Sequence, residues 1–312
     1  MRTRQSAEPR AHHFVPQCWL AGFTDTGEPD GMLYVTDLKR KKQWRCKPSK
    51  AGHRRDFNRI DDPIVPDPVK IEKLFSSIES DVAPVFRNLT KEKRGPKDGF
   101  ELGMLVEYLA IQWARVPSFR DVVREAFESH FHTEILSSPE AWERALRRVG
   151  ASPGDPGTDY AKVLEGLATG KLKFTAEPAF YLKQAAGVLK VVDETQTLMK
   201  RRWGWQISES GQFIGSDSPI ALDGPLDEPI GIGNAPWVSY PVNRHLLLYG
   251  TKEVIEPPHL TTKLIARHNT FVMLTADEHV YSHRPDFHWL DSSDHCQNDW
   301  QRFSKGDFSP AG

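Results

Sequence analysis

His12-His13-Phe14-Val15-Pro16-Gln17-Cys18-Trp19-Leu20-Ala21-Gly22-Phe23 is the stretch around which the 312-residue chain is organised. Pro16 suits the first position of a helix, where its missing N–H is not needed, and Gly22 suits the position just past a helix end. The stretch therefore predicts a helix of fewer than two turns, anchored by Trp19, Leu20 and Phe23.

The two adjacent histidines stand immediately before this helix. The partial positive charge of a helix N-terminus favours neutral imidazole, the form that binds a metal ion or accepts a proton. Neighbouring residues in an extended segment point to opposite faces, so His12 and His13 share a metal only if the backbone is irregular there. Two interpretations stay open: at least one of the pair has a chemical role, or both are buried and structural.

The composition of the chain argues against several classes of protein. The net charge of −1 and the pI near 6.9 argue against a chain that is basic overall, so nucleic-acid binding has to depend on local patches. The three cysteines are too scattered for a disulfide framework or a metal knuckle. No apolar run approaches the length of a bilayer span. We expect a soluble, cytoplasmic protein with no membrane partner.

A basic hairpin is predicted after a loop at residues 27–31. Strands are expected at 32–37 and 43–46, and six of the ten residues from Leu38 to Lys47 are basic. Lys41 and Trp44 are the candidates for holding a phosphate backbone and stacking a base. The alternative is a solvated hairpin tip that protects the sheet edge against pairing.

Helices are predicted over residues 68–89, 98–132, 159–169, 176–201 and 261–274. Glu79 lies beside the apolar stripe of the first of these. Gln112 and Arg115 are three residues apart and share a face, and Pro117 bends or interrupts the helix just after them. This pair is interpreted as a cleft wall, or Arg115 caps carbonyls that the proline leaves free.

The second half of the chain is predicted to contain paired strands. Residues 202–207 and 212–216 are expected to form a hairpin around 209–211, and Asp217 follows directly. Asp217 is either held by its own turn hydrogen bonds or projects from the strand end into a site. The most strand-like remaining run, 237–249, contains Asn243.

The predicted organisation has five parts: a disordered arm at 1–10, an N-terminal part at 11–149, a flexible loop at 150–160, a C-terminal part at 161–290 that packs on the first as one domain, and a loosely ordered tail at 291–312. Amphipathic helices and adjacent strand pairs predict a mixed α/β (α+β) fold, mainly helical with short antiparallel hairpins. No P-loop, Rossmann glycine pattern, zincin motif or nucleophile elbow is present.

The order of these motifs resembles a bacterial family known as domain of unknown function 4238. Its opening pattern is His-His-x-Val-Pro-x-x-aromatic-Leu-x-x-Phe, followed by a basic hairpin, an acidic helix, Gln-x-x-Arg-x-Pro and Ser-Asp-x-Pro. The matching residues are His12, His13, Val15, Pro16, Trp19, Leu20, Phe23, Glu79, Gln112, Arg115, Pro117, Ser216, Asp217 and Pro219. Trp19 stands where tyrosine is usual. The resemblance implies which residues belong together and carries no activity.

Two functions compete on these residues. The first is a metal-dependent hydrolase, a nuclease or phosphoesterase, acting on an anionic substrate. Its catalytic residues are His12, His13, Glu79 and Asp217; its substrate-binding residues are Gln112, Arg115, Lys41, Trp44 and Asn243; its divalent metal ligands are His13, Glu79 and Asp217. The second is a nucleotide- or nucleic-acid-binding sensor without turnover.

A third interpretation makes the same polar groups a buried network that only maintains the fold. Because unpartnered buried charges are costly, we expect the His-His turn, Glu79, Gln112, Arg115 and Asp217 to meet in one pocket under every interpretation.

Overall fold

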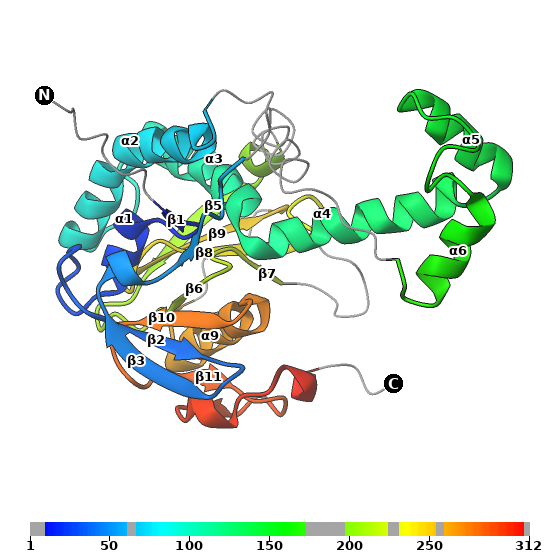
Figure 1. Cartoon of the computed structure of the whole chain (residues 1–312). Coiled ribbons are helices and arrows are strands. Elements are labelled where there is room, and N and C mark those ends of the chain that lie inside the picture. The colour runs from blue at the N-terminus through cyan, green and yellow to red at the C-terminus, as the bar shows by residue number, and fades with distance from the viewer. Residues whose placement is uncertain (1–9, 61–66, 173–196, 224–230, 254–258, 309–312) are drawn as a thin grey trace, which may run out of the picture. The chain divides into compact units, whose positions relative to one another are not determined.

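The computed structural model describes residues 10–60, 67–172, 197–223, 231–253 and 259–308 (Figure 1). It divides into two compact units, one formed by residues 1–117 and 185–312, the other by residues 118–184. The segment 150–160 lies inside the second unit, between two of its helices.

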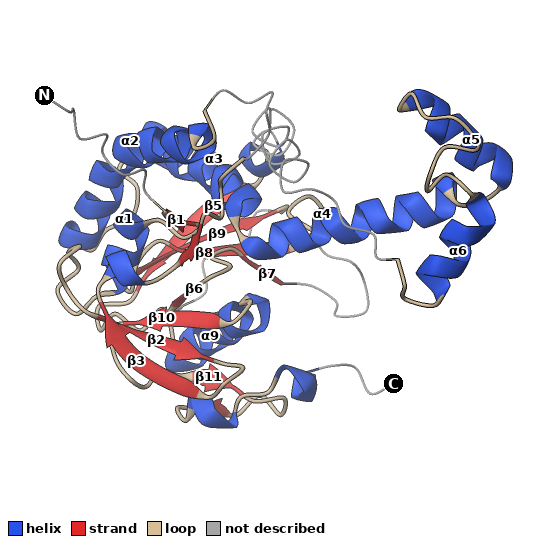
Figure 2. Ribbon diagram, in the orientation of Figure 1, coloured by secondary structure: helices blue, strands red, loops and turns tan. Residues whose placement is uncertain are grey.

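Two four-stranded antiparallel sheets form the larger unit (Figure 2). One has the order β3-β2-β10-β6, with β2 at Leu33–Asp37, β3 at Lys42–Cys46, β6 at Gly215–Ser216 and β10 at His279–Ser282. The other has the order β5-β9-β8-β7, with β5 at Arg202–Ile207, β7 at Ala221–Asp223, β8 at Trp237–Pro241 and β9 at Leu246–Thr251.

Two smaller antiparallel ribbons are also present in the described part of this unit. Strands β1 (Ala11–His13) and β4 (His53–Arg55) form one, and β11 (Trp289–Leu290) and β12 (Cys296–Gln297) form the other. The 3-10 turn η2 (Pro48–Lys50) leads into β4.

Helices of the larger unit begin and end where local chemistry dictates. Those with both ends described include α1 (Gln17–Leu20) continued by the 3-10 turn η1 (Ala21–Phe23), α2 (Lys70–Glu92), α3 (Gly99–Arg115) and α9 (Thr262–Thr275). The Asp98 side chain caps α3 by accepting from two backbone N–H groups, and Thr261 caps α9. α3 ends because Pro117 forces Val116 into an extended conformation.

The smaller unit is helical. It contains most of α4 (Pro117–His130), the π-helical turn η3 (Phe131–Ile135), α5 (Pro139–Arg148) and α6 (Tyr160–Ala168). The Trp142 indole donates to the Thr158 carbonyl at 2.6 Å, which ties α5 to the loop before α6.

The opening motif packs into the core of the larger unit. Trp19, Leu20 and Phe23 are fully buried among the apolar side chains of α2, α3 and β8. The Trp19 indole donates to the Pro241 carbonyl at 2.9 Å. A Cβ on Gly22 would lie 2.6 Å from the Cβ of Asn243, so this position has room only for glycine.

The predicted fold class is confirmed: the chain is mixed α+β with small antiparallel sheets, and helices hold more of its residues than strands do. The helix predicted at 68–89 is α2, and the proline break at Pro117 separates α3 from α4. The run at 237–249 is a pair of strands, β8 and β9, rather than one. None of the helices in the described ranges is long and apolar enough to cross a bilayer.

Two local predictions are wrong. Strand β5 pairs with β9, and β6 pairs with β10, so residues 202–207 and 212–216 do not form a hairpin with each other. Residues 291–308 are not a loose tail, because β12 pairs with β11 and Trp300 and Phe303 are buried against it in a hydrophobic cluster. The helix predicted at 176–201 and the arm predicted at 1–10 fall almost entirely outside the described residues.

Candidate functional site

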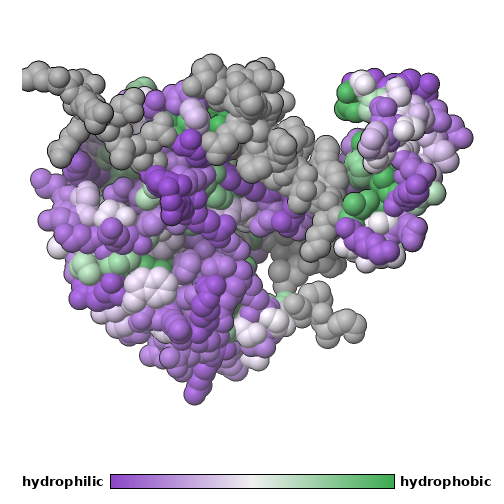
Figure 3. Space-filling view, viewed as in Figure 1, coloured by the Kyte–Doolittle hydropathy of each residue, from purple (hydrophilic) through white to green (hydrophobic). Residues whose placement is uncertain are grey.

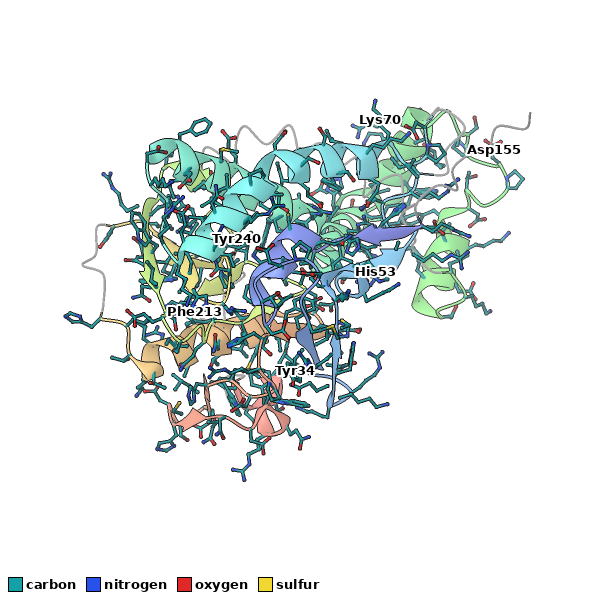
Figure 4. The ribbon with its side chains drawn as sticks, turned by 90° about the vertical axis from the view of Figure 1, so that its left-hand side faces the viewer. Tyr34, His53, Lys70, Asp155, Phe213 and Tyr240 are labelled. Carbon is teal, nitrogen blue, oxygen red and sulfur yellow. The ribbon has the colours of Figure 1, made fainter. Side chains whose placement is uncertain are left out.

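The β1–β4 ribbon separates the two adjacent histidines. His13 pairs directly with His53, and His12 pairs with Arg54. Cross-strand partners share a face, so the His13 and His53 rings lie edge to face with centroids 5.2 Å apart. His12 points to the opposite face, is fully buried, and accepts from the Asn58 backbone N–H at 2.9 Å. Figure 4 shows His53 on this short ribbon, between α2 and the sheet that carries Tyr34.

The His13 imidazole is held in its neutral form. Its Nε2 lies 3.1 Å from the Gln17 amide nitrogen, and its buried Nδ1 has no hydrogen-bond partner among the described residues. Burial first, then the neighbouring His53 and Arg115, lower the pKa of His13 to about 4. His13 is therefore a neutral imidazole at neutral pH, and the exposed Gln17 side chain covers its Nε2.

Arg115 joins the ribbon to Glu79. Its Nη1 lies 2.6 Å from Glu79 Oε1, its Nη2 donates to the His13 carbonyl, and its guanidinium stacks 4.4 Å from the Phe75 ring centre. The Arg115 side chain is 1% exposed and that of Glu79 is 21% exposed. Burial raises the pKa of Glu79, and the charge of Arg115 only partly opposes this. Glu79 is thus a partly accessible carboxyl group with enhanced proton affinity.

Gln112 also holds the ribbon rather than facing solvent. Its Nε2 donates to the Phe14 carbonyl at 3.0 Å, and its Oε1 accepts from the Tyr108 hydroxyl at 3.3 Å. Gln112 is fully buried. We call the β1–β4 ribbon with Glu79, Gln112 and Arg115 the histidine ribbon.

Cys18 lies within electrostatic range of Glu79 and Arg115. Burial first, and then the charge of Glu79, raise the pKa of the Cys18 thiol to about 12. The thiolate is the nucleophilic form of cysteine, so Cys18 is not an activated nucleophile in this environment.

Asp217 belongs to a different network. Its carboxylate accepts from the backbone N–H groups of Asp277, Glu278 and His279 at 2.7–2.8 Å, and it is 2% exposed. It forms no hydrogen bond or ion pair with His13, Glu79, Gln112 or Arg115 in the described part of the chain.

His279 is the centre of that network. Its ring nitrogens lie 3.5 Å from Asp217 and 3.8 Å from Asp37, which is its direct partner across β10 and β2. Burial alone would lower the pKa of His279, but its contact with Asp217 and then the charge of Asp37 raise it. We call Asp37, Asp217 and His279 the aspartate network.

The basic hairpin carries mostly paired charges. Lys39 lies 3.5 Å from both Asp277 and Glu278, and Arg40 lies 2.9 Å from Asp37. Lys41 donates to the Phe303 carbonyl.

Trp44 is 43% exposed and packs edge-on against His279 at 5.7 Å. It is therefore available to a partner from solvent.

The hairpin continues into a longer basic segment. Residues 39–59 contain ten lysines and arginines and one acidic residue, Asp56. Lys42, Lys47 and Lys50 are exposed and form no ion pair among the described residues. The visible surface of the larger unit in this view is largely hydrophilic (Figure 3). Arg54 bonds Asp277 at 3.3 Å, so this segment, which we call the basic segment, runs between the histidine ribbon and the aspartate network.

Asn243 shapes the β8–β9 turn. Its Oδ1 accepts from the backbone N–H groups of His245 at 2.7 Å and Leu246 at 2.9 Å, and it is fully buried.

The structure thus brings His13, Glu79, Gln112 and Arg115 together and places Asp217, Asn243, Lys41 and Trp44 in other contacts. Their catalytic and binding roles stay predictions. No group of three or more histidine, cysteine, aspartate or glutamate side chains in the described ranges is arranged to hold a metal ion. Sequence reasoning missed His53, Asp37 and His279. His53 belongs to a noticeable His-Arg-Arg cluster, but no local signal relates Asp37 to a histidine 242 residues later.

Residues 11–286 match the model of the family described as Protein of unknown function (DUF4238), so the chain belongs to this family. No curated protein and no solved structure matches the chain.

Proposed function

We propose, starting from this family membership and from the site geometry, that the chain is a hydrolase of phosphoesters in an anionic substrate such as a nucleotide or nucleic acid. One observation carries the proposal. The neutral His13–His53 pair lies on a ribbon whose second strand is part of a segment with ten basic residues and one acidic residue. A proton acceptor beside a phosphate-attracting surface suits phosphoester hydrolysis.

His13 and Glu79 are the proposed acid–base pair. His13 Nε2 takes a proton from water as the water oxygen bonds to phosphorus. Glu79, whose pKa burial raises, gives a proton to the leaving oxygen as its bond to phosphorus breaks. A bound phosphate raises the proton affinity of both groups, which moves the low pKa of His13 toward neutrality.

Arg115 and Gln112 are positioning residues in this proposal. Both donate to main-chain carbonyls of the His13–Phe14 segment, and Arg115 also holds Glu79. In this proposal Arg115 and Gln112 orient the base and the acid, whereas the sequence predicted that they bind the substrate. The divalent metal stays a separate proposal, and no step above requires one.

A sensor that binds nucleotides or nucleic acid without turnover is the second candidate. It is favoured by exposed Trp44 and by Lys42, Lys47 and Lys50, which form no ion pair with any described residue and need no acid–base chemistry to bind phosphates.

The test is turnover by the purified chain. Single-stranded DNA, RNA, nucleotides and a chromogenic phosphodiester are incubated with the protein, each with EDTA or with Mg²⁺ or Mn²⁺. We expect hydrolysis, and a loss of about 100-fold or more in kcat for His13→Gln. The matched control is His132→Gln, an exposed histidine of the smaller unit, which should retain activity.

The two candidates separate on the same samples. Binding that weakens in a Lys47→Gln/Lys50→Gln variant, without hydrolysis under any condition, would favour the sensor. Hydrolysis that survives His13→Gln would contradict the acid–base assignment. Activity that is lost only in the samples with EDTA would show that hydrolysis requires a divalent metal ion.

A further inference from the structure

A small cavity lined by both polar and apolar side chains lies between the loop that precedes β6 and the loop that follows β10. It has a volume of about 50 Å³ and is lined by Gly211, Gln212, Ser282, His283, Arg284 and Asp286 among others. This is room for a few waters or for one group the size of a phosphate. It shares no lining residue with the histidine ribbon or the aspartate network.

Gly211 lets two further basic side chains approach the cavity wall. Its φ of +68° is a left-handed conformation that favours glycine, and a Cβ there would lie 2.8 Å from His245 Cε1 and 3.1 Å from Arg244 Cγ. Arg244 and His245 therefore pack directly behind the backbone that lines the cavity.

Arg284 is solvent-exposed and Arg244 is half-buried, and neither forms an ion pair with an acidic side chain among the described residues. Arg244 donates to the Thr24 carbonyl and to His245 Nε2, which are neutral groups. Burial first lowers the pKa of Arg244; Asp25 opposes this and Arg284 adds to it. The Arg284 side chain forms no hydrogen bond or ion pair with any described residue, and Asp286 is likewise unpaired.

His283 also lies near more positive than negative groups. Burial first, and then Arg244, Arg284 and His245 in that order, lower the pKa of His283 to about 4. Asp286 acts in the opposite direction and is the weakest contributor. His283, Arg284 and the Asp286 carboxylate thus line the small cavity, while Arg244 and His245 lie behind Gly211.

We propose that this cavity is a binding site for a small oxyanion, a phosphate or carboxylate group, held by Arg284 and His283 with Arg244 as the second positive charge. An oxyanion in the cavity accepts a charge-assisted hydrogen bond from Arg284 and is attracted by the positive charge of Arg244 behind Gly211. The site is independent of the proposed hydrolase site, because the two have no residue in common.

The test is calorimetric titration of the full-length protein with inorganic phosphate and, in a separate arm, with acetate. Binding of either anion supports the proposal, and the tighter one identifies its source. Arg284→Gln and His283→Gln should each weaken binding about tenfold or more. Arg87→Gln on the exposed face of α2 is the matched control and should bind as the parent does.

A site-specific readout comes from NMR of the histidine ring protons. A bound anion should raise the pKa of His283 from about 4, because a negative neighbour stabilises imidazolium. The Lys47→Gln/Lys50→Gln variant should keep both the binding and this shift. The proposal is overturned if neither anion binds, if Arg284→Gln binds normally, or if the lysine variant alone loses binding.

Discussion

The histidine ribbon and the aspartate network each contain residues of the sequence motifs, but the hydrogen bonds that hold Gln112 and Arg115 and those that hold Asp217 run in opposite directions. In the ribbon, Gln112 and Arg115 side chains donate to main-chain carbonyls, and His13 and Glu79 keep unused hydrogen-bonding capacity. In the network, three main-chain N–H groups donate to Asp217, which keeps its carboxylate fully occupied.

This difference teaches how to interpret a buried polar residue. A side chain saturated by backbone donors maintains a turn, whereas a side chain that is positioned by others and left partly unbonded is available for chemistry. The ribbon is therefore the better candidate site, and the network is the better candidate for a structural lock.

The largest loss of stability is expected for Arg115→Leu, a substitution in the histidine ribbon. It leaves the Glu79 carboxyl group without its buried partner and the His13 carbonyl without its donor. We expect a loss of about 4 kcal/mol in the free energy of unfolding, measured with urea. Lys73→Gln breaks an exposed pair with Asp67 and serves as control, with a loss below about 1 kcal/mol. A small effect of Arg115→Leu would mean that the ribbon does not depend on this pair.

Asp217→Asn should cost about 3 kcal/mol, because an amide NH₂ replaces one acceptor in front of backbone N–H groups. Activity per folded molecule should stay near the parent value if the network is only a lock. Loss of turnover in a stably folded Asp217→Asn protein would instead show that Asp217 is catalytic. The aspartate network would then not be purely structural.

The pH dependence of stability should have opposite signs in the two regions. The folded pKa of His13, about 4, lies below its unfolded value, so stability is lost as pH falls from about 6.5 toward 4. The folded pKa of His279 is raised, so its contribution is present below about 6.5 and is lost as pH rises through the folded value.

Urea unfolding from pH 5 to 8 checks this pair of signs. His13→Gln should remove about 1–2 kcal/mol of the loss between pH 7 and pH 5. His279→Gln should flatten only the neutral side of the curve. The same change of slope in both variants would contradict the assignment.

The smallest effect concerns the ion pair between Arg54 and Asp277, which joins the two regions. Their side chains are 47% and 24% exposed, so Arg54→Gln should cost no more than about 0.5 kcal/mol. The effects of Arg115→Leu and Asp217→Asn should then add in the double variant within about 0.5 kcal/mol. Non-additive unfolding energies would show that the regions are one cooperative site.

Local chemistry made much of the fold predictable from sequence. Pro16 precedes α1, and Pro117 separates α3 from α4. Strand pairing was not predictable in the same way, because β5 finds its partner in β9 rather than in the next strand. Alternation of side chains indicates that a strand exists and says nothing of which strand it meets.

The candidate site was predictable only where its members share a motif. Gln112 and Arg115 could be related by their spacing on one helix, and both hold the opening stretch. The His13–His53 pair and the Asp37–His279 pair depend on strand register, which the distance along the chain conceals. Asp217 could be identified as a turn residue, but its backbone donors lie 60 residues away.

The bond from Trp19 to the Pro241 carbonyl spans 222 residues and has a consequence for biosynthesis. The ribosome makes the opening motif first, yet the β8–β9 turn that receives Trp19 and Gly22 is made much later. Until then the apolar side chains of the nascent motif have no native partner, and closing so long a loop slows folding. The chain should therefore complete its core after translation, and a protein truncated before residue 241 should be captured by chaperones or aggregate.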